Sequence, residues 1–368
     1  MPKQTPLYTR HEALGASFTD FGGWQMPLKY GSELEEHHTV RRAAGLFDLS
    51  HMGEVLVTGP QAAEFLNYAL VGNLAVMPVG KAKYSLICNA DGGVIDDLIT
   101  YRLAEDRFLV VPNASNADTV ASELRDRAAD FDAVVEDQSE STALVAVQGP
   151  NAEAILLAMA APGDAEAITS LRYYAAVEVE LVGVPVLLAR TGYTGEDGFE
   201  LFVGNSFAVR VWDAALEAGA GHGLIPCGLA SRDSLRLEAG MPLYGNELGL
   251  STNPFEAGLG PVVSLKKTED FVGRSVLEPL KAAGPARRLV GLRGTGRRSA
   301  RAGYDVVIDG AAVGTVTSGL PSPTLGYPVA LAYVDSALAE PGTEVQVDLR
   351  GRPEPFTVVE TPFYKRAK

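Results

Sequence analysis

The chain has 368 residues, of which 46% are hydrophobic, and it carries 31 Lys and Arg against 46 Asp and Glu, so its formal net charge is −15. An acidic field of this size repels nucleic acid and anionic membranes, which excludes binding to either through general electrostatics. The length and the hydrophobic content predict two or three domains with well-packed cores.

The two cysteines, Cys88 and Cys227, lie far apart in apolar surroundings, which is typical of reduced core residues in an intracellular protein. The first residues lack the apolar segment of a secretory signal. No window reaches the roughly 18 uninterrupted apolar residues that span a bilayer. We therefore expect a cytoplasmic protein.

The first half of the chain alternates strand-like and helix-like patterns. Strands are expected at 54–58, 84–88, 94–101 and 107–111, and helices at 60–70 and 115–129. The turn at 89–93 contains Asp-Gly-Gly, which readily supplies the positive φ of a hairpin loop. It predicts that the strands on either side of it pair as a hairpin.

The rhythm continues with strands expected at 143–148, 177–181, 184–190 and 199–203, and helices at 151–160, 207–218 and 229–239. Hairpin pairing with helices on one side favours an α+β fold over a doubly wound parallel sheet. After a boundary near 281–285, short strands at 288–292, 304–308, 312–317, 345–349 and 356–359 predict a small β barrel or sandwich. We divide the chain into 1–280, made of two intertwined α+β domains with one around 54–140, and a barrel domain over 285–368.

The strand at 94–101 carries adjacent carboxylates, Asp96 and Asp97, on opposite faces among mostly apolar neighbours. One of them is expected to point into the protein, where it would suit proton transfer or the stabilisation of a cationic centre. An ordinary edge-strand acid is an equally good interpretation. The strand pattern does not choose between the two residues.

A second concentration lies at 190–203, where three glycines allow tight turns that present Tyr193, and Glu200 follows in a strand. A carboxylate there suits paired N–H donors of an amidine-like heterocycle, with tyrosines as flat walls. The alternative is a hairpin loop with surface acids. Arg232 and Arg236 share one side of the 229–239 helix and suit either a ligand carboxylate or an acid of their own helix.

Three further features have ordinary interpretations. His37 and His38 diverge on a helix and predict a solvated face rather than a metal cluster. His51 has no matching nucleophile and receives no assignment. Six arginines between Arg287 and Arg301 are interpreted as part of solvated strand ends and loops. The more specific alternative is a docking patch for an acidic partner.

Together these segments resemble one family, the aminomethyltransferase or T-protein of the glycine cleavage system. The matching stretches follow the family's order over nearly the whole chain: Gly45-Leu-Phe-Asp-Leu-Ser-His-Met-Gly53, Gly92-Gly-Val-Ile-Asp-Asp97, Val111-Pro-Asn-Ala114, Val147-Gln-Gly-Pro150, the segment from Arg190 to Glu200, and Arg232-Asp-Ser-Leu-Arg-Leu-Glu-Ala-Gly-Met-Pro-Leu-Tyr-Gly-Asn-Glu247. The last stretch is long and specific.

The resemblance implies a three-domain cloverleaf with a C-terminal β barrel and a central channel that holds tetrahydrofolate as cosubstrate. It also implies transfer of a one-carbon unit from the aminomethyl-loaded lipoyl group of a carrier, the H-protein, with release of ammonia and formation of 5,10-methylenetetrahydrofolate. No metal is implied. The family's essential acid corresponds to Asp97 and its pterin-recognising carboxylate to Glu200. Folate-contacting or channel-lining positions correspond to Tyr84, Tyr101, Asn113, Tyr174, Tyr193 and Arg232, and a basic residue near the folate tail corresponds to Lys365 or Arg366.

Two other functions remain as alternatives. A folate-dependent demethylase acting on a small sulfonium or methylamine substrate would share the folate channel and differ at the substrate mouth. A non-enzymatic folate-binding assembly factor for iron–sulfur proteins typically carries Lys-Gly-Cys-Tyr-x-Gly-Gln-Glu. This chain has Ala239-Gly-Met-Pro-Leu-Tyr-Gly-Asn-Glu247 with no cysteine, which disfavours that function.

Overall fold

We describe residues 2–367 from a computed structural model of the chain. The internal contacts divide the chain into two compact units. The first unit comprises the residues up to 69 together with 73–85 and 98–232, and the second comprises 70–72, 86–97 and the residues from 233 on. Each unit therefore contains segments that are distant in sequence.

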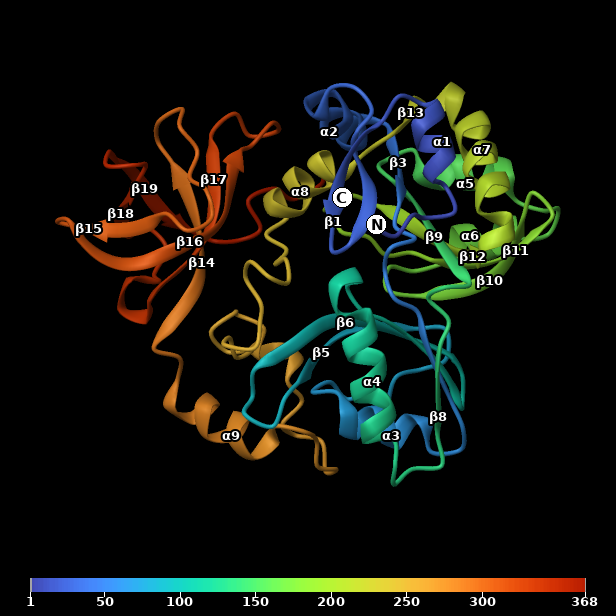
Figure 1. The fold of residues 1–368 in the computed structure, drawn as a ribbon, viewed down its shortest axis with the longest axis horizontal. Coiled ribbons are helices and arrows are strands. Elements are labelled where there is room, and N and C mark those ends of the chain that lie inside the picture. Colours follow the sequence, from blue (N-terminus) through green and yellow to red (C-terminus); the bar gives the residue numbers. More distant parts are fainter. Residues whose placement is uncertain (1, 368) are drawn as a thin grey trace. The chain divides into compact units, whose positions relative to one another are not determined.

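The largest sheet of the first unit has six strands in the order β10-β11-β12-β9-β3-β13 (Figure 1). These strands are β3 (Ala44–Asp48), β9 (Thr142–Gln148), β10 (Ala176–Leu181), β11 (Val184–Ala189), β12 (Gly198–Gly204) and β13 (Leu224–Pro226). Only the β13–β3 pair among them is parallel. Helices α5 (Ala152–Met159) and α7 (Ala208–Gly219) share one apolar core with this sheet, in which Trp212 is fully buried.

The rest of the chain before residue 240 contains a five-stranded sheet, a two-stranded sheet and further helices. The five-stranded sheet has the order β5-β6-β7-β4-β8 and consists of β4 (Val55–Thr58), β5 (Ala82–Cys88), β6 (Val94–Ala104), β7 (Arg107–Val111) and β8 (Val134–Asp137). Strands β1 (Ser17–Phe21) and β2 (Trp24–Lys29) form the small sheet. The helices are α1 (Tyr8–Ala13), α2 (Glu33–Arg42), α3 (Ala62–Ala69), α4 (Ala117–Arg127), α6 (Ala165–Ser170) and α8 (Leu229–Glu238).

The second unit contains a closed barrel in the order β14-β17-β16-β15-β18-β19 (Figure 1). Its strands are β14 (Arg287–Gly294), β15 (Asp305–Ile308), β16 (Ala311–Pro321), β17 (Pro328–Asp335), β18 (Glu344–Asp348) and β19 (Pro353–Val359), and helix α9 (Arg274–Ala283) precedes them. Small and β-branched residues fill the barrel interior around Phe356. The α+β class and the C-terminal barrel expected from the sequence are thereby confirmed.

Strand β17 was not expected, because its residues are buried on both faces and give no alternating pattern. Ala330, Ala332 and Val334 face the barrel interior. Val329 and Leu331 belong to a second core that also contains Leu237 of α8. This second core packs the end of α8 against the barrel.

Helix α2 corrects one expectation, because His37 is fully buried instead of lying on a solvated face. The contacts of the neighbouring Glu36 explain why this side of α2 is buried. Its carboxylate accepts hydrogen bonds from the backbone N–H groups of Tyr30 at 2.8 Å and Gly228 at 2.9 Å. A carboxylate that satisfies buried amides must itself lie inside, and it draws that side of α2 inward.

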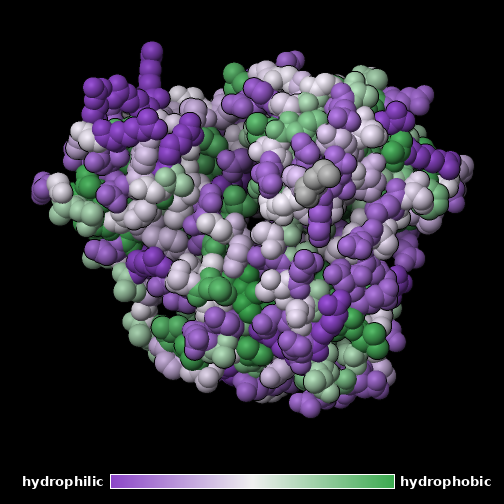
Figure 2. Space-filling view, viewed as in Figure 1, coloured by the Kyte–Doolittle hydropathy of each residue, from purple (hydrophilic) through white to green (hydrophobic). Residues whose placement is uncertain are grey.

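The cysteines and the visible surface have the character that the sequence predicts. Cys88 and Cys227 are both buried and are not joined in a disulfide, as expected. Hydrophilic residues cover much of the face in view in Figure 2. Among residues 2–367, no helix is long and apolar enough to cross a bilayer.

Several of the six arginines between Arg287 and Arg301 make local contacts. Arg287 stacks on the ring of Tyr333 at 4.6 Å, Arg298 lies 3.6 Å from a carboxylate oxygen of Glu354, and Arg301 donates to the Gly319 carbonyl at 2.9 Å. These contacts favour the ordinary interpretation of the run as strand ends and loops.

Candidate functional site

The adjacent carboxylates on β6 differ in burial. Asp96 is fully buried and Asp97 is half-buried. The strand follows the expected hairpin turn, in which Asn89 accepts hydrogen bonds from the N–H groups of Asp91 and Gly93 at 3.0 and 2.8 Å. One carboxylate therefore points inward, as the strand pattern predicts, while the family resemblance selects the more accessible one.

A tyrosine missed by the sequence analysis lies within electrostatic range of this pair, in the same unit. Burial raises the pKa of Tyr244, and the charges of Asp96 and Asp97 raise it further. The phenol therefore stays protonated and can donate a hydrogen bond at neutral pH. Its only sequence signal was its place in the long stretch from Arg232 to Glu247.

Glu200 forms the centre of a polar cluster in the first unit. Its side chain is buried, and its Oε2 atom accepts hydrogen bonds from the hydroxyl of Thr191 and, at 3.4 Å, from that of Tyr101. The two hydroxyls also lie 3.0 Å apart. Burial and the nearby Glu200 raise the pKa of Tyr101 well above its usual value, so this phenol remains a donor. These donors fix the orientation of the Glu200 carboxylate.

The loop between β11 and β12, which carries Thr191 and Tyr193, is held by Gln148. The Gln148 amide donates to the Thr191 carbonyl at 3.0 Å and accepts from the Thr194 hydroxyl at 2.9 Å. A Cβ on Gly192 or Gly198 would lie 2.1 or 2.5 Å from this side chain. These glycines therefore allow close packing on Gln148, whereas Gly195 makes the turn with a positive φ of +79°.

Arg190 fixes the far side of the same loop. Its guanidinium binds Asp197 through two hydrogen bonds of 3.0 and 2.5 Å and donates to the Leu171 carbonyl at 3.0 Å. Its Cζ atom also lies 4.9 Å from the centre of the Phe199 ring. A bidentate pair of this kind is more rigid than a single contact, so Glu200 emerges from a well-defined turn.

Arg232 and His51 contribute buried nitrogens that the described residues leave without a partner. The Arg232 Cζ atom lies over Tyr193 at 4.9 Å, and Glu200 attracts the guanidinium charge. Within residues 2–367, Nη1 of Arg232 and Nδ1 of His51 are buried without a hydrogen-bond partner. Buried polar atoms are normally satisfied, so these two nitrogens fit a polar ligand in the first unit.

His51 is neutral at physiological pH. Its pKa is lowered to about 4, chiefly by burial; the charge of Asp48 opposes this shift and that of Arg232 adds to it. Its place in the Ser50-His51-Met52 segment was the only sequence signal for it.

The structure brings five of the expected residues into one neighbourhood. Tyr101, Tyr193, Glu200 and Arg232 are linked by the contacts above, and Tyr174 acts electrostatically on Tyr101. Tyr174 is half-buried, whereas Tyr173, whose ring meets it edge to face, is 49% exposed, which favours Tyr174 as the inward-facing member of that pair.

The other expected residues lie outside those contacts. Tyr84 is half-buried on β5, and Asn113 is half-buried just after β7. Lys365 and Arg366 are both exposed near the end of the described chain. Asp97 belongs to the second unit. Thr191 was missed although it lies in the matching segment from Arg190 to Glu200, because a threonine carries no charge or ring to single it out.

Comparison with known proteins identifies the family. The family model of the GCVT N-terminal domain matches residues 7–267, and that of the glycine cleavage T-protein C-terminal barrel domain matches residues 287–365. The chain belongs to the glycine cleavage T-protein family. Family membership makes it a transferase of the aminomethyltransferase type and confirms the resemblance seen in the sequence.

Individual relatives agree over their full length. The aminomethyltransferase of Streptomyces avermitilis is 58% identical over 100% of this chain and 99% of its own, and that of Bacillus subtilis is 45% identical over 100% of each. The crystal structure of the glycine cleavage system aminomethyltransferase T from Bartonella henselae is 39% identical, with a TM-score of 0.92 over 99% of both chains. The demethylase and the iron–sulfur assembly factor receive no support from these matches.

The buried His51 predicts a loss of stability in acid. Its folded pKa of about 4 lies below the ordinary value of 6.5, so the unfolded state binds more protons between these pH values. Stability from this residue is therefore lost as the pH falls from about 6.5 to 4, by about 3 kcal/mol in total. We expect His51→Asn to flatten this part of the curve of unfolding free energy against pH, measured by urea denaturation.

His222→Asn, which removes an imidazole elsewhere in the first unit, is the matched control. An acid limb in His51→Asn as steep as in the wild type would contradict a neutral, buried His51.

Proposed function

We propose that the chain is the aminomethyltransferase of the glycine cleavage system. It takes the aminomethyl group from the dihydrolipoyl sulfur of the H-protein and transfers its carbon to tetrahydrofolate. The products are 5,10-methylenetetrahydrofolate, ammonia and the dihydrolipoyl carrier. The observation that carries this proposal is the full-length identity to aminomethyltransferases, which includes all the motifs named above. We expect the protein to act in the cytoplasm.

In this proposal the Glu200 cluster recognises the pterin. The carboxylate suits adjacent N–H donors on a flat heterocycle, and the hydroxyls of Thr191 and Tyr101 set its orientation. The unpartnered nitrogens of Arg232 and His51 supply further polar contacts for a ligand. Tyr174 and Tyr193 provide aromatic surfaces in the same neighbourhood, and Tyr84 and Asn113 complete the expected folate-contacting set.

Asp97 carries the chemical step. The carbon being transferred develops positive charge as the amine leaves, and a preorganised carboxylate stabilises that charge and moves protons. Tetrahydrofolate supplies the nitrogen that accepts the carbon. Asp97 is half-buried, so its carboxylate is partly accessible, whereas that of Asp96 is enclosed.

If Asp97 carries the chemical step, its replacement should lower kcat without weakening the binding of tetrahydrofolate. Asp97→Asn should bind tetrahydrofolate within about twofold of the wild type, because the residue acts mainly on the transition state. Its kcat should fall by about 100-fold or more, which is typical of the loss of an acid or base. Titration calorimetry and steady-state assays with loaded H-protein measure the two quantities.

Asp96→Asn is the neighbouring control and should lower kcat much less. Equal losses of affinity and rate in Asp97→Asn would make Asp97 a binding residue instead.

The assignment of Glu200 predicts the opposite pattern. Glu200→Gln keeps the shape of the side chain but loses the charge-assisted hydrogen bonds to the pterin, so the Kd for tetrahydrofolate should rise about tenfold or more. Glu196→Gln, in the same loop but paired with Arg41 at 3.1 Å, should leave this Kd unchanged. Unchanged affinity in Glu200→Gln would remove Glu200 from the pterin site.

A further inference from the structure

The hairpin formed by β1 and β2 ends in a tight glycine turn. Phe21 is the last residue of β1, and the two residues that follow it, Gly22 and Gly23, have φ values of +59° and +84°. Two consecutive positive φ values are characteristic of the type I′ turn, whose twist matches that of paired strands. The Asp20 carboxylate accepts a hydrogen bond from the Gly23 N–H at 3.0 Å. We call residues 20–23 the hairpin tip.

The first residues of the chain hold the hairpin tip in place. The Lys3 N–H donates to the Gly23 carbonyl at 2.7 Å, and the Gln25 N–H donates to the Lys3 carbonyl at 2.8 Å. The Lys3 ammonium also lies 5.5 Å from the centre of the Trp24 ring. A two-stranded hairpin is only marginally stable by itself, so this third segment restrains the tip.

The hairpin tip lies against two other segments of the first unit. The centres of the Phe21 and His51 rings are 5.6 Å apart, and their planes meet edge to face at 82°. Gly22 lies beside Ser115, because a Cβ on this glycine would come within 3.5 Å of the Ser115 Cβ and backbone nitrogen. Edge-to-face pairs at this separation are attractive, so the Phe21 ring has a defined place on His51.

The two segments under the hairpin tip meet at one place. Gly53, two residues after His51, donates its N–H to the Pro112 carbonyl at 3.1 Å. A Cβ on Gly53 would come within 2.7 Å of the Pro112 ring, so the two backbones are in close contact. The next residue is Asn113, a position that the family resemblance assigns to folate. The hairpin tip therefore lies where the His51 segment meets a segment assigned to folate binding.

Phe21 combines an accessible ring with a buried polar neighbour. Phe21 is 36% exposed, whereas His51 is 3% exposed. Within residues 2–367, the buried Nδ1 atom of His51 has no hydrogen-bond partner. Ligand sites combine aromatic walls with a few polar groups, and buried polar atoms without a protein partner are unusual elsewhere. An accessible aromatic ring that packs on such an atom therefore suits the wall of a ligand site.

We propose that Phe21 is a tetrahydrofolate-binding residue, whose ring forms an aromatic wall of the folate site and shields the imidazole of His51 from water. The inference rests on the proposed function, because it takes tetrahydrofolate as the ligand of the first unit. The flat rings of the folate offer an aromatic side chain stacked or edge contacts. The hairpin of β1 and β2 thereby takes a direct part in binding.

The first test is the affinity of the full chain for tetrahydrofolate, measured by titration calorimetry. We expect Phe21→Ala to raise the Kd about fivefold, because the ligand loses an aromatic contact. Phe21→Leu, which keeps the apolar bulk, should also raise the Kd, and Phe21→Tyr, which keeps the ring, should not. Phe207→Ala is the matched control, since Phe207 is also 36% exposed in the same unit, and it should leave the Kd unchanged.

A chemical readout without ligand or turnover separates this inference from the proposed function. Diethyl pyrocarbonate modifies neutral imidazoles that it can reach, and His51 is neutral and covered. We expect His51 to react about tenfold faster in Phe21→Ala than in the wild type, because its cover is removed. In Phe207→Ala the reaction should be as slow as in the wild type. Mass spectrometry of the digested protein follows the modification of His51.

The outcomes distinguish the two claims. A more reactive His51 with an unchanged Kd in Phe21→Ala would overturn the proposal, because Phe21 would then only cover the imidazole. An unchanged Kd with a raised KM for loaded H-protein would also overturn it and would assign Phe21 to the carrier's arm. A more reactive His51 in a chain whose wild type binds no tetrahydrofolate would refute the proposed function and retain only the cover over His51.

Discussion

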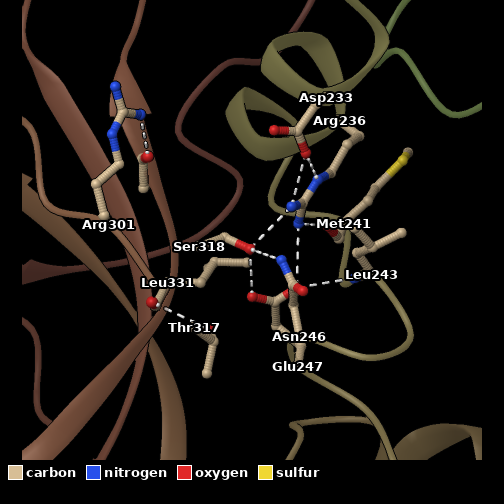
Figure 3. Close-up of polar contacts among 11 residues, drawn as sticks. Asp233, Arg236, Met241, Leu243, Asn246, Glu247, Arg301, Thr317, Ser318 and Leu331 are labelled. Atoms are coloured by element: carbon tan, nitrogen blue, oxygen red, sulfur yellow. Dashed lines mark hydrogen bonds and ion pairs between the residues drawn. The ribbon is translucent and has the colours of Figure 1, made fainter. Parts of the chain in front are cut away.

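The buried ion pair between Arg236 and Glu247 is the interaction on which the second unit depends. A carboxylate with no exposed surface is costly unless donors surround it, and Glu247 receives donors from α8, from its own loop and from the barrel strand β16. Helix α8 and the loop that follows it are therefore joined at one group to the barrel strand β16, which lies far along the chain (Figure 3). Loss of Arg236 would leave the Glu247 carboxylate buried without a charged partner, at a cost of about 3–5 kcal/mol.

The first unit uses the same principle at Glu200 with a different outcome. There the donors are the neutral hydroxyls of Thr191 and Tyr101, and Arg232 lies nearby with a buried nitrogen that no described residue satisfies. A cluster in which the carboxylate has donors on both oxygens, like that of Glu247, stabilises the fold. A cluster that leaves buried donors unsatisfied is suited to a ligand, and this difference separates the supporting carboxylate from the proposed binding one.

The sequence predicted those parts of the fold that have local signals. The Asp-Gly-Gly turn located the β5–β6 hairpin, and short strand-like segments after residue 285 located most barrel strands. Strand β17 gave no such signal because its two faces enter two different cores. His37 was misplaced because the reason for its burial lies in the contacts of Glu36 with distant backbone amides.

The candidate site was predictable to a similar extent. Glu200 and Tyr193 were identified by their residue types. Thr191 and Tyr244 could be identified only from the residues that surround them in the structure. Burial alone would have chosen Asp96 over Asp97, because Asp96 is the enclosed member of the pair. The choice of Asp97 came from the family resemblance.

The most direct test of the central claim is the measurement of products. The purified chain is given tetrahydrofolate and H-protein loaded with the aminomethyl group, and 5,10-methylenetetrahydrofolate and ammonia are quantified, with unloaded H-protein as the control. Our account predicts both products in equal amounts and only with the loaded carrier. Tight binding of tetrahydrofolate without any carrier-dependent product would contradict it.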